Sequence, residues 1–227
     1  MRPRPAWRTA SHQGPRTVNA DAVAMANGVV ALADGVGDSH AATRAALAAV
    51  NAAVRVPAMA GPVAALAAAH AAVMAADADG DCVLVVAQPY AGGHHIAWVG
   101  DVRAYAWDGA GLWQLTRDHT LAQYFRDHGG VVEPRMEHLV TTSVRTTAPD
   151  RYGLTSTGAA NVLLTTDGVH KVLSHEAMTA ILRGAANPAE ALVGAALAAG
   201  TRDNTTAVML SRAPAPALPT VPLTTAA

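Results

Sequence analysis

The sequence predicts an α+β fold with antiparallel sheets and helices packed on their outer faces. Strand-like and helix-like segments come in blocks rather than in strict alternation, which favours this layered arrangement. No repeat of solenoid length is present. The 227 residues suffice for one sizeable core and are few for two. We therefore expect a single domain over residues 1–212, followed by a proline-rich, unpatterned tail over residues 213–227 that is predicted to be disordered.

The first third of the chain predicts a hairpin followed by two helices. The runs AVAMAN and GVVALA, residues 22–33, are strand-like and meet at the turn-forming pair Asn27-Gly28. Residues 39–55 begin with Ser39 as a candidate N-cap and continue without glycine or proline. Residues 62–76 open with Pro62, which suits the first turn of a helix.

The rest of the chain predicts several more strands and helices. Residues 81–117 contain β-branched and aromatic runs separated by glycine turns, which predict three or four antiparallel strands. Residues 118–158 have no clean period beyond one short helix, so we expect mostly loop there. Residues 160–168 predict a strand, two helices follow over 176–185 and 188–200, and residues 204–212 predict the closing strand.

Composition and charge exclude several classes of function. A formal net charge of -1 provides no basic field for binding nucleic acid. The best membrane-span candidate, residues 56–76, is interrupted by Pro57 and Gly61-Pro62, and alanine inserts poorly. The N-terminus has no apolar segment typical of a signal peptide. We therefore expect a cytoplasmic protein without nucleic-acid or membrane partners, in which the single cysteine, Cys82, is a core residue rather than a reactive thiol.

Four acidic residues lie at the ends of predicted strands: Asp34, Asp101, Asp167 and Asp203. Any one of them is explained by turn chemistry, because Asp-Gly pairs form tight turns. Four carboxylates gathered at one sheet edge would repel one another unless protons or cations neutralised them. Oxygen ligands suit Mg²⁺ and Mn²⁺, whereas zinc favours histidine and cysteine. A glycine after the aspartate, as in Asp34-Gly35, would let a metal or substrate approach the main chain.

Six motifs occur in an order that resembles a known family of enzymes. They are RTVNADA at 16–22, ADGVG at 33–37, VGDVRAY at 99–105, LTRDHT at 115–120, LLTTDGV at 163–169 and RDNTTAV at 202–208. Together they resemble the ordered motifs of the PP2C, or PPM, metal-dependent protein phosphatases of the compact bacterial type. Each motif alone is weak, but six in series over residues 11–210 are specific.

The resemblance implies a β-sandwich of two antiparallel sheets flanked by α-helices on both sides, with a dinuclear metal centre at the edge between the sheets. By motif position, Asp34 would bridge two Mn²⁺ or Mg²⁺ ions and act with Arg16 as a catalytic residue, and Arg16 would bind the substrate phosphate. The implied metal-binding residues are Asp21, Asp34, Gly35 through its carbonyl oxygen, Asp101, Asp167 and Asp203. Among these, Asp101 corresponds to the acid that holds a third, weaker ion in bacterial members.

The activity implied is hydrolysis of phosphoserine and phosphothreonine monoesters by a water activated between the two ions. No protein nucleophile is then needed, and the arginine fork would grip the phosphate. The expected partners are a phosphorylated protein substrate and a serine/threonine kinase or its targets, and we expect a monomer.

Two departures from the family pattern leave a second hypothesis open. Ala20 stands where the family has Glu or Gln, and residues 138–148 lack the family's usual stretch near the substrate flap. The alternative is a PP2C-like binding or sensing module with weak or no turnover.

Overall fold

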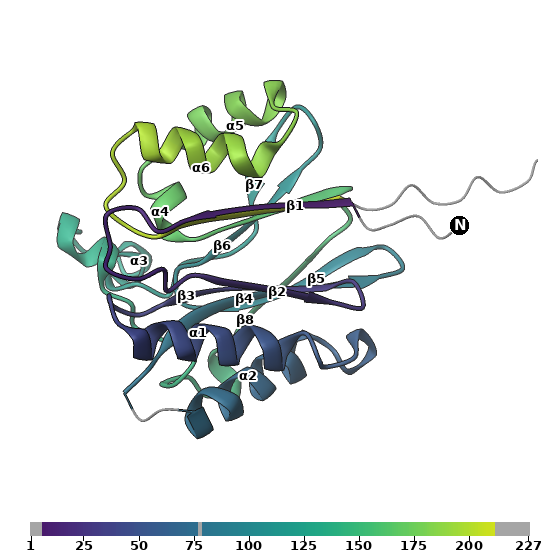
Figure 1. The fold of residues 1–227 in the computed structure, drawn as a ribbon, viewed down its shortest axis with the longest axis vertical. Helices are drawn as coiled ribbons and strands as arrows, with labels where there is room; N and C mark the ends of the chain where they lie inside the picture. Colours follow the sequence, from purple (N-terminus) through teal and green to yellow (C-terminus); the bar gives the residue numbers. More distant parts are fainter. Residues whose placement is uncertain (1–5, 77–78, 212–227) are drawn as a thin grey trace, which may run out of the picture.

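The computed structural model describes residues 6–76 and 79–211 (Figure 1). The tail from Ala213, predicted to be disordered, lies outside the described residues.

Two five-stranded sheets form the centre of the molecule. The first has the order β1 (Ala6–His12), β10 (Thr205–Ser211), β9 (Asn161–Thr165), β6 (Arg103–Trp107), β7 (Leu112–Gln114). The second has the order β2 (Ala22–Ala26), β3 (Val29–Gly35), β4 (Cys82–Tyr90), β5 (Gly93–Val99), β8 (Gly153–Thr157). Every neighbouring pair is antiparallel.

Helices cover the outer face of each sheet, so the layers run helix, sheet, sheet, helix (Figure 1). The pair α1 (His40–Ala53) and α2 (Pro62–Ala76) packs on the second sheet, and the pair α5 (His175–Gly184) and α6 (Pro188–Ala198) packs on the first. The shorter helical segments are α3 (Leu121–Asp127), α4 (Asp167–His170), η1 (Ala58–Ala60), η2 (Pro134–His138) and η3 (Pro149–Arg151). The predicted sandwich with helices on both sides is confirmed.

The alternation of side chains along β3 shows how the layers are held together. Val30 and Leu32 belong to the apolar core between the two sheets, whereas Ala31 and Ala33 belong to the core under α1 and α2. This follows from the pleat, which sends successive side chains to opposite faces. The core under α1 and α2 is rich in alanine, and small side chains let the helices lie close to the sheet.

The predicted hairpin and both N-terminal helices are confirmed. Val23 pairs with Leu32 across the Asn27-Gly28 turn, and Ser39 caps α1 by accepting a hydrogen bond from the Ala42 N–H at 3.2 Å. Cys82 is fully buried in the core, as expected.

Two strands and the short helix α4 are absent from the sequence-based prediction. β1 pairs along its whole length with β10, and β8 pairs with the outer side of β5. β8 is an edge strand in which Leu154 is 54% exposed, so no buried face produces a clear hydrophobic period. The expectation of loop over 153–157 was therefore wrong.

The topology brings strand ends from both sheets to one end of the sandwich. In the second sheet, β2 begins where β3 ends, with Ala22 opposite Ala33. In the first sheet, β10 begins where β9 ends, with Ala207 opposite Thr165. These strand ends lie at the end of the sandwich where α4 is found (Figure 1). The acidic residues beside them are thereby brought to one place. Within residues 6–76 and 79–211, no helix combines the length and the apolar character that crossing a membrane requires.

Candidate metal centre

A cavity of about 270 Å³ lies at this end of the sandwich. Most of the residues that the sequence singles out line it: Arg16, Asp34, Gly35, Asp101, Asp167 and Asp203. They come from both sheets and from the loop before β2. Residues separated by up to 187 positions in the chain are therefore neighbours around one cavity.

Asp21 links the two sheets beside this cavity. It precedes β2 of the second sheet, yet its Oδ2 accepts a hydrogen bond from Thr206 Oγ1 on β10 of the first sheet at 2.6 Å and one from Thr166 Oγ1, the N-cap residue of α4, at 3.0 Å. Its other oxygen, Oδ1, is buried with no hydrogen-bond partner among the described residues. One carboxylate oxygen thus anchors the side chain and the other is left to bind something else.

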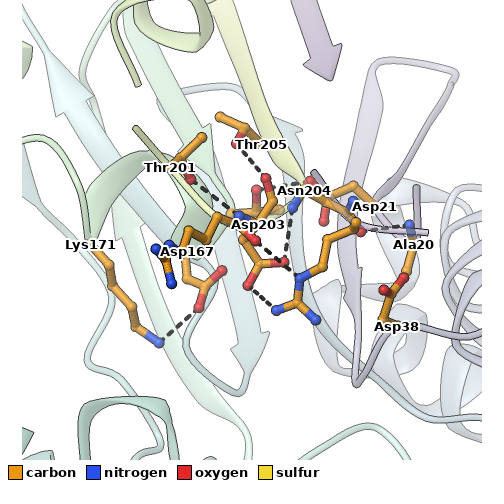
Figure 2. A network of polar contacts seen from close by, with 12 residues as sticks. Ala20, Asp21, Asp38, Asp167, Lys171, Thr201, Asp203, Asn204 and Thr205 are labelled. Atoms are coloured by element: carbon orange, nitrogen blue, oxygen red, sulfur yellow. Dashed lines mark hydrogen bonds and ion pairs between the residues drawn. The ribbon is translucent and has the colours of Figure 1, made fainter. Parts of the chain in front are cut away.

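The buried side chain of Asn204 holds the loop that carries Arg16 and Asp21. Its Oδ1 accepts a hydrogen bond from the Ala20 N–H at 2.8 Å (Figure 2). Its Nδ2 donates to the carbonyl oxygens of Gln13 at 2.7 Å and Val18 at 2.8 Å. The sequence contains only a weak signal for this role, an asparagine between an acid and a strand, and the role was not predicted from it.

Asp38 fixes the same loop from the other side. Its carboxylate accepts hydrogen bonds from the backbone N–H of Thr17 at 2.9 Å and of Val18 at 3.1 Å. These bonds join the turn after β3 to the segment that begins with Arg16. Sequence reasoning missed this clamp because nothing in the sequence pairs residue 38 with residue 17.

Arg16 reaches the cavity, where its guanidinium forms an ion pair with Asp203. Its Nη2 lies 2.7 Å from Asp203 Oδ2, and its Nε donates to the Arg202 carbonyl oxygen at 3.2 Å. The Arg16 side chain remains 34% exposed. Arg16, the predicted phosphate-binding residue, is therefore accessible, and its guanidinium is directed at the Asp203 carboxylate.

Lys171 is a second cation beside the cavity, where it contacts two of the carboxylates that line it. Its role was not predicted from the sequence. Its Nζ lies 2.6 Å from Asp101 Oδ2 and 2.9 Å from Asp167 Oδ2; the contact with Asp167 is visible in Figure 2. The remaining oxygen of Asp167, Oδ1, is buried without a hydrogen-bond partner within the described part of the chain.

Close packing explains the glycines that follow the acids. A Cβ on Gly35 would lie 2.8 Å from both the Ala20 Cβ and the Ala42 carbonyl oxygen, and a Cβ on Gly168 would clash with the Asn204 carbonyl oxygen. The sequence suggested that glycine lets a metal or substrate approach the main chain. In the structure these positions face other protein atoms, so glycine is needed for the approach of α1, α4 and the loop.

The third and fourth motifs are tied to each other. Arg103 forms a two-pronged ion pair with Asp118, in which Nε and Nη2 lie 2.8 and 2.7 Å from the two carboxylate oxygens. This geometry is typical of strong arginine–carboxylate pairs. The fourth motif thus supports the strand that follows Asp101.

Burial is the main cause that raises the pKa values of four carboxylates at this end of the sandwich: Asp21, Asp34, Asp101 and Asp203. Burial raises the pKa of Asp34 well above its ordinary value, and the charges of Asp21 and Asp167 add to the effect. Burial raises the pKa of Asp21 to about 7, although hydrogen bonds from Thr206 and Thr166 work in the opposite direction. These groups ionise reluctantly because negative charge is concentrated there, and a nearby cation would relieve that concentration.

The residues fit hard divalent cations, although they do not form a finished ligand cage. Within residues 6–76 and 79–211, no group of three or more His, Cys, Asp or Glu side chains is already arranged to hold a metal ion. The donors are nevertheless all oxygens, and the free buried oxygens of Asp21 and Asp167 lack partners. Such donors suit Mg²⁺ and Mn²⁺ rather than zinc. A bound ion would have to draw the carboxylates closer together.

His138 also lines the cavity, at the end of η2. It borders an adjacent, wider cavity of about 920 Å³ as well, together with Arg103 and Arg126. Residues 138–148, which depart from the family pattern, are held by Asp81. Its carboxylate accepts hydrogen bonds from Ser143 Oγ at 2.5 Å and from the Arg145 N–H at 3.0 Å.

The layered sandwich is shared with solved structures of PPM serine/threonine phosphatases, which confirms the resemblance seen in the motifs. The chain is similar to the serine/threonine phosphatase PstP/Ppp of Mycobacterium tuberculosis, with 25% identity, a TM-score of 0.77, and coverage of 91% of this chain and 98% of that one.

Two further solved structures show the same likeness. The catalytic domain of PstP in complex with two manganese ions is 25% identical, with a TM-score of 0.75 and coverage of 91% and 97%. The PPM phosphatase MsPP of Mycobacterium smegmatis in complex with cacodylate is 23% identical, with a TM-score of 0.76 and coverage of 92% and 98%. Neither a protein-family model nor a curated protein matches this chain.

Proposed function

We propose that this protein is a metal-dependent serine/threonine protein phosphatase that hydrolyses phosphoserine and phosphothreonine monoesters. The observation that carries the proposal is the gathering of Asp34, Asp167, Asp203 and Arg16 around one cavity in a fold shared with PPM phosphatases. Acids that have no reason to meet for stability alone are brought together from both sheets, which supports a functional site.

Two Mn²⁺ or Mg²⁺ ions would be held by the oxygen donors at the cavity. The residues proposed to hold them are Asp21, Asp34, Asp167 and Asp203 through carboxylates and Gly35 through its carbonyl oxygen. The unpartnered oxygens of Asp21 and Asp167 support this assignment. When bound, such ions lower the pKa of water and neutralise charge on phosphoryl oxygens.

The chain's own residues would bind and orient the phosphate. Arg16 offers a planar set of donors and keeps its charge at every working pH. In the structure these donors face Asp203. To bind a phosphate, the guanidinium would have to leave Asp203 or contact the carboxylate and the phosphate together. Asn204 and Asp38 restrict the loop that carries Arg16, which limits the orientations the fork can take.

The proposed substrate is a phosphorylated protein rather than a small metabolite. The wider cavity beside the site, about 920 Å³ in volume, offers room for residues that flank the phosphorylated side chain. A serine/threonine kinase that phosphorylates the same substrates is the proposed functional partner.

Ala20 favours a second candidate, a binding or sensing module with weak turnover. Its side chain is fully buried and contributes no oxygen where the family has Glu or Gln. A site with one polar group fewer could recognise a phosphorylated partner without hydrolysing it efficiently.

Turnover of p-nitrophenyl phosphate with added Mn²⁺ separates the two candidates. We expect turnover that needs the metal and falls about 100-fold or more in Asp34→Ala and Asp167→Ala, because each removes charge that stabilises the reacting complex. Asp150→Ala is the matched control, since it removes an exposed carboxylate outside the cavity. No turnover at any Mn²⁺ concentration, with a native circular dichroism spectrum, would favour the binding module.

A further inference from the structure

Lys171 is the only lysine in the sequence. It is the C-cap residue of α4, and its side chain is 14% exposed. Fifteen of the chain's cationic side chains, histidine aside, are arginines, since Lys and Arg together number 16. The only lysine side chain of the sequence is thus placed against the candidate metal centre, largely buried.

The ammonium lies between two carboxylates that both line the cavity. Asp101 Oδ2 is 2.6 Å from Nζ and Asp167 Oδ2 is 2.9 Å from it, and the Asp101 side chain is only 5% exposed. A position shared by two partly buried carboxylates is where a small cation binds. Lysine suits it better than arginine because its charge is compact.

Local structure keeps the ammonium in this position. Lys171 follows Asp167 by four residues on one helical turn, so its side chain reaches back over the same face. α4 itself is fixed because Gly168 packs against Asn204 with no room for a Cβ. A tethered charge of this kind does not dissociate at low concentration, unlike a free ion.

We propose that Lys171 is a built-in cation that takes the place of a divalent ion between Asp101 and Asp167. Asp101 then positions the lysine instead of binding a third ion, and the cavity keeps its remaining carboxylates for the two ions of the proposed function, on which this inference rests. Removing the ammonium opens one additional site for a divalent cation.

The number of Mn²⁺ ions bound to the whole chain tests this directly. Isothermal titration calorimetry gives the number of ions bound, and electron paramagnetic resonance follows the free Mn²⁺. We expect Lys171→Gln to bind one more ion per chain than wild type. Lys171→Arg, which keeps the charge, is expected to bind the wild-type number. Arg55→Gln is the matched control, because it removes an exposed positive charge at the end of α1.

A measurement on the unaltered protein covers the case in which Lys171→Gln does not fold. Labelling with lysine that carries carbon-13 at Cε gives a single side-chain resonance, because only one lysine is present. During titration with diamagnetic Mg²⁺, we expect this resonance to stay away from the position of a free, solvated lysine up to saturation. Asp101→Asn is expected to move it towards that position.

The inference is overturned if Lys171→Gln binds the same number of ions as wild type, or if Mg²⁺ releases the lysine resonance to its solvated position. The results of these two experiments do not depend on whether the proposed phosphatase activity is found. A protein without phosphatase turnover can still show the difference of one ion, and an active phosphatase can lack it.

Discussion

The acids around the cavity differ in their partners, although the sequence presents the four strand-end aspartates as equivalent. Asp21 is held by the hydroxyl of Thr206 on β10 and by that of Thr166 at the start of α4. Asp203 is paired with Arg16, and Asp167 is paired with Lys171. The chain's own cations thus contact some of the carboxylate oxygens, while Asp21 Oδ1 and Asp167 Oδ1 remain buried without a partner among the described residues.

Asp21 predicts how the stability of the metal-free protein depends on pH. The folded protein raises the pKa of Asp21 to about 7, above an unfolded value of about 3.9. Its contribution is therefore most favourable below about pH 4 and is lost as pH rises through about 7. With EDTA present, we expect wild type to lose about 2 kcal/mol of unfolding free energy relative to Asp21→Asn between pH 5 and pH 8.

Urea denaturation of both proteins at the two pH values measures this difference. The asparagine can still accept the threonine hydrogen bonds but cannot ionise, and both proteins share every other titrating group. A difference between the two that is independent of pH would show that Asp21 ionises normally in the folded state.

The sequence was sufficient to predict which acids lie at strand ends, because strands and turns leave local patterns. It did not predict Lys171 or Asn204 as site residues. Both act through contacts with residues far away in the chain or through a short helix, α4, that has no pattern of its own. A lone lysine beside an Asp-Gly motif was the one available signal.

Among the strands, those with a buried face were predicted, and two without a clear one, β1 and β8, were missed. α1, α2 and the β2–β3 hairpin have continuous apolar faces or recognisable caps. β8 is an edge strand with exposed alternate residues, and β1 is identified only by its pairing with β10. Element boundaries also matter for the site, because Asp167 belongs to the first turn of α4 rather than to the strand before it.

Gly35 at the end of β3 tests how closely α1 packs on the sheet near the site. We expect Gly35→Ala to lower the unfolding free energy by about 1–3 kcal/mol, because its Cβ would meet backbone of α1 that cannot move independently. Gly194→Ala is the control, since a Cβ there meets nothing within 4 Å and alanine favours the helix by about 0.5–1 kcal/mol.

Chemical denaturation of the two variants gives both values. If Gly35→Ala proves as stable as wild type, the end of β3 is more adaptable than the structure indicates, and its carbonyl oxygen is less rigidly placed for an ion.

For the whole molecule, the sandwich topology is what makes a cation site possible. Antiparallel pairing in both sheets brings the start of one strand beside the end of its neighbour, and stacking of the sheets brings the two sets of ends together (Figure 1). The motifs predicted this arrangement through resemblance, whereas composition and periodicity indicated only antiparallel sheets with outer helices.

Anomalous X-ray diffraction from crystals grown with Mn²⁺ shows directly whether this end of the sandwich binds two ions. We expect two manganese peaks in the cavity lined by Asp34, Asp167 and Asp203, with Asp21 beside it, and Lys171 still in contact with Asp101. An absence of manganese from this cavity at saturating concentration would show that these acids do not form a metal centre.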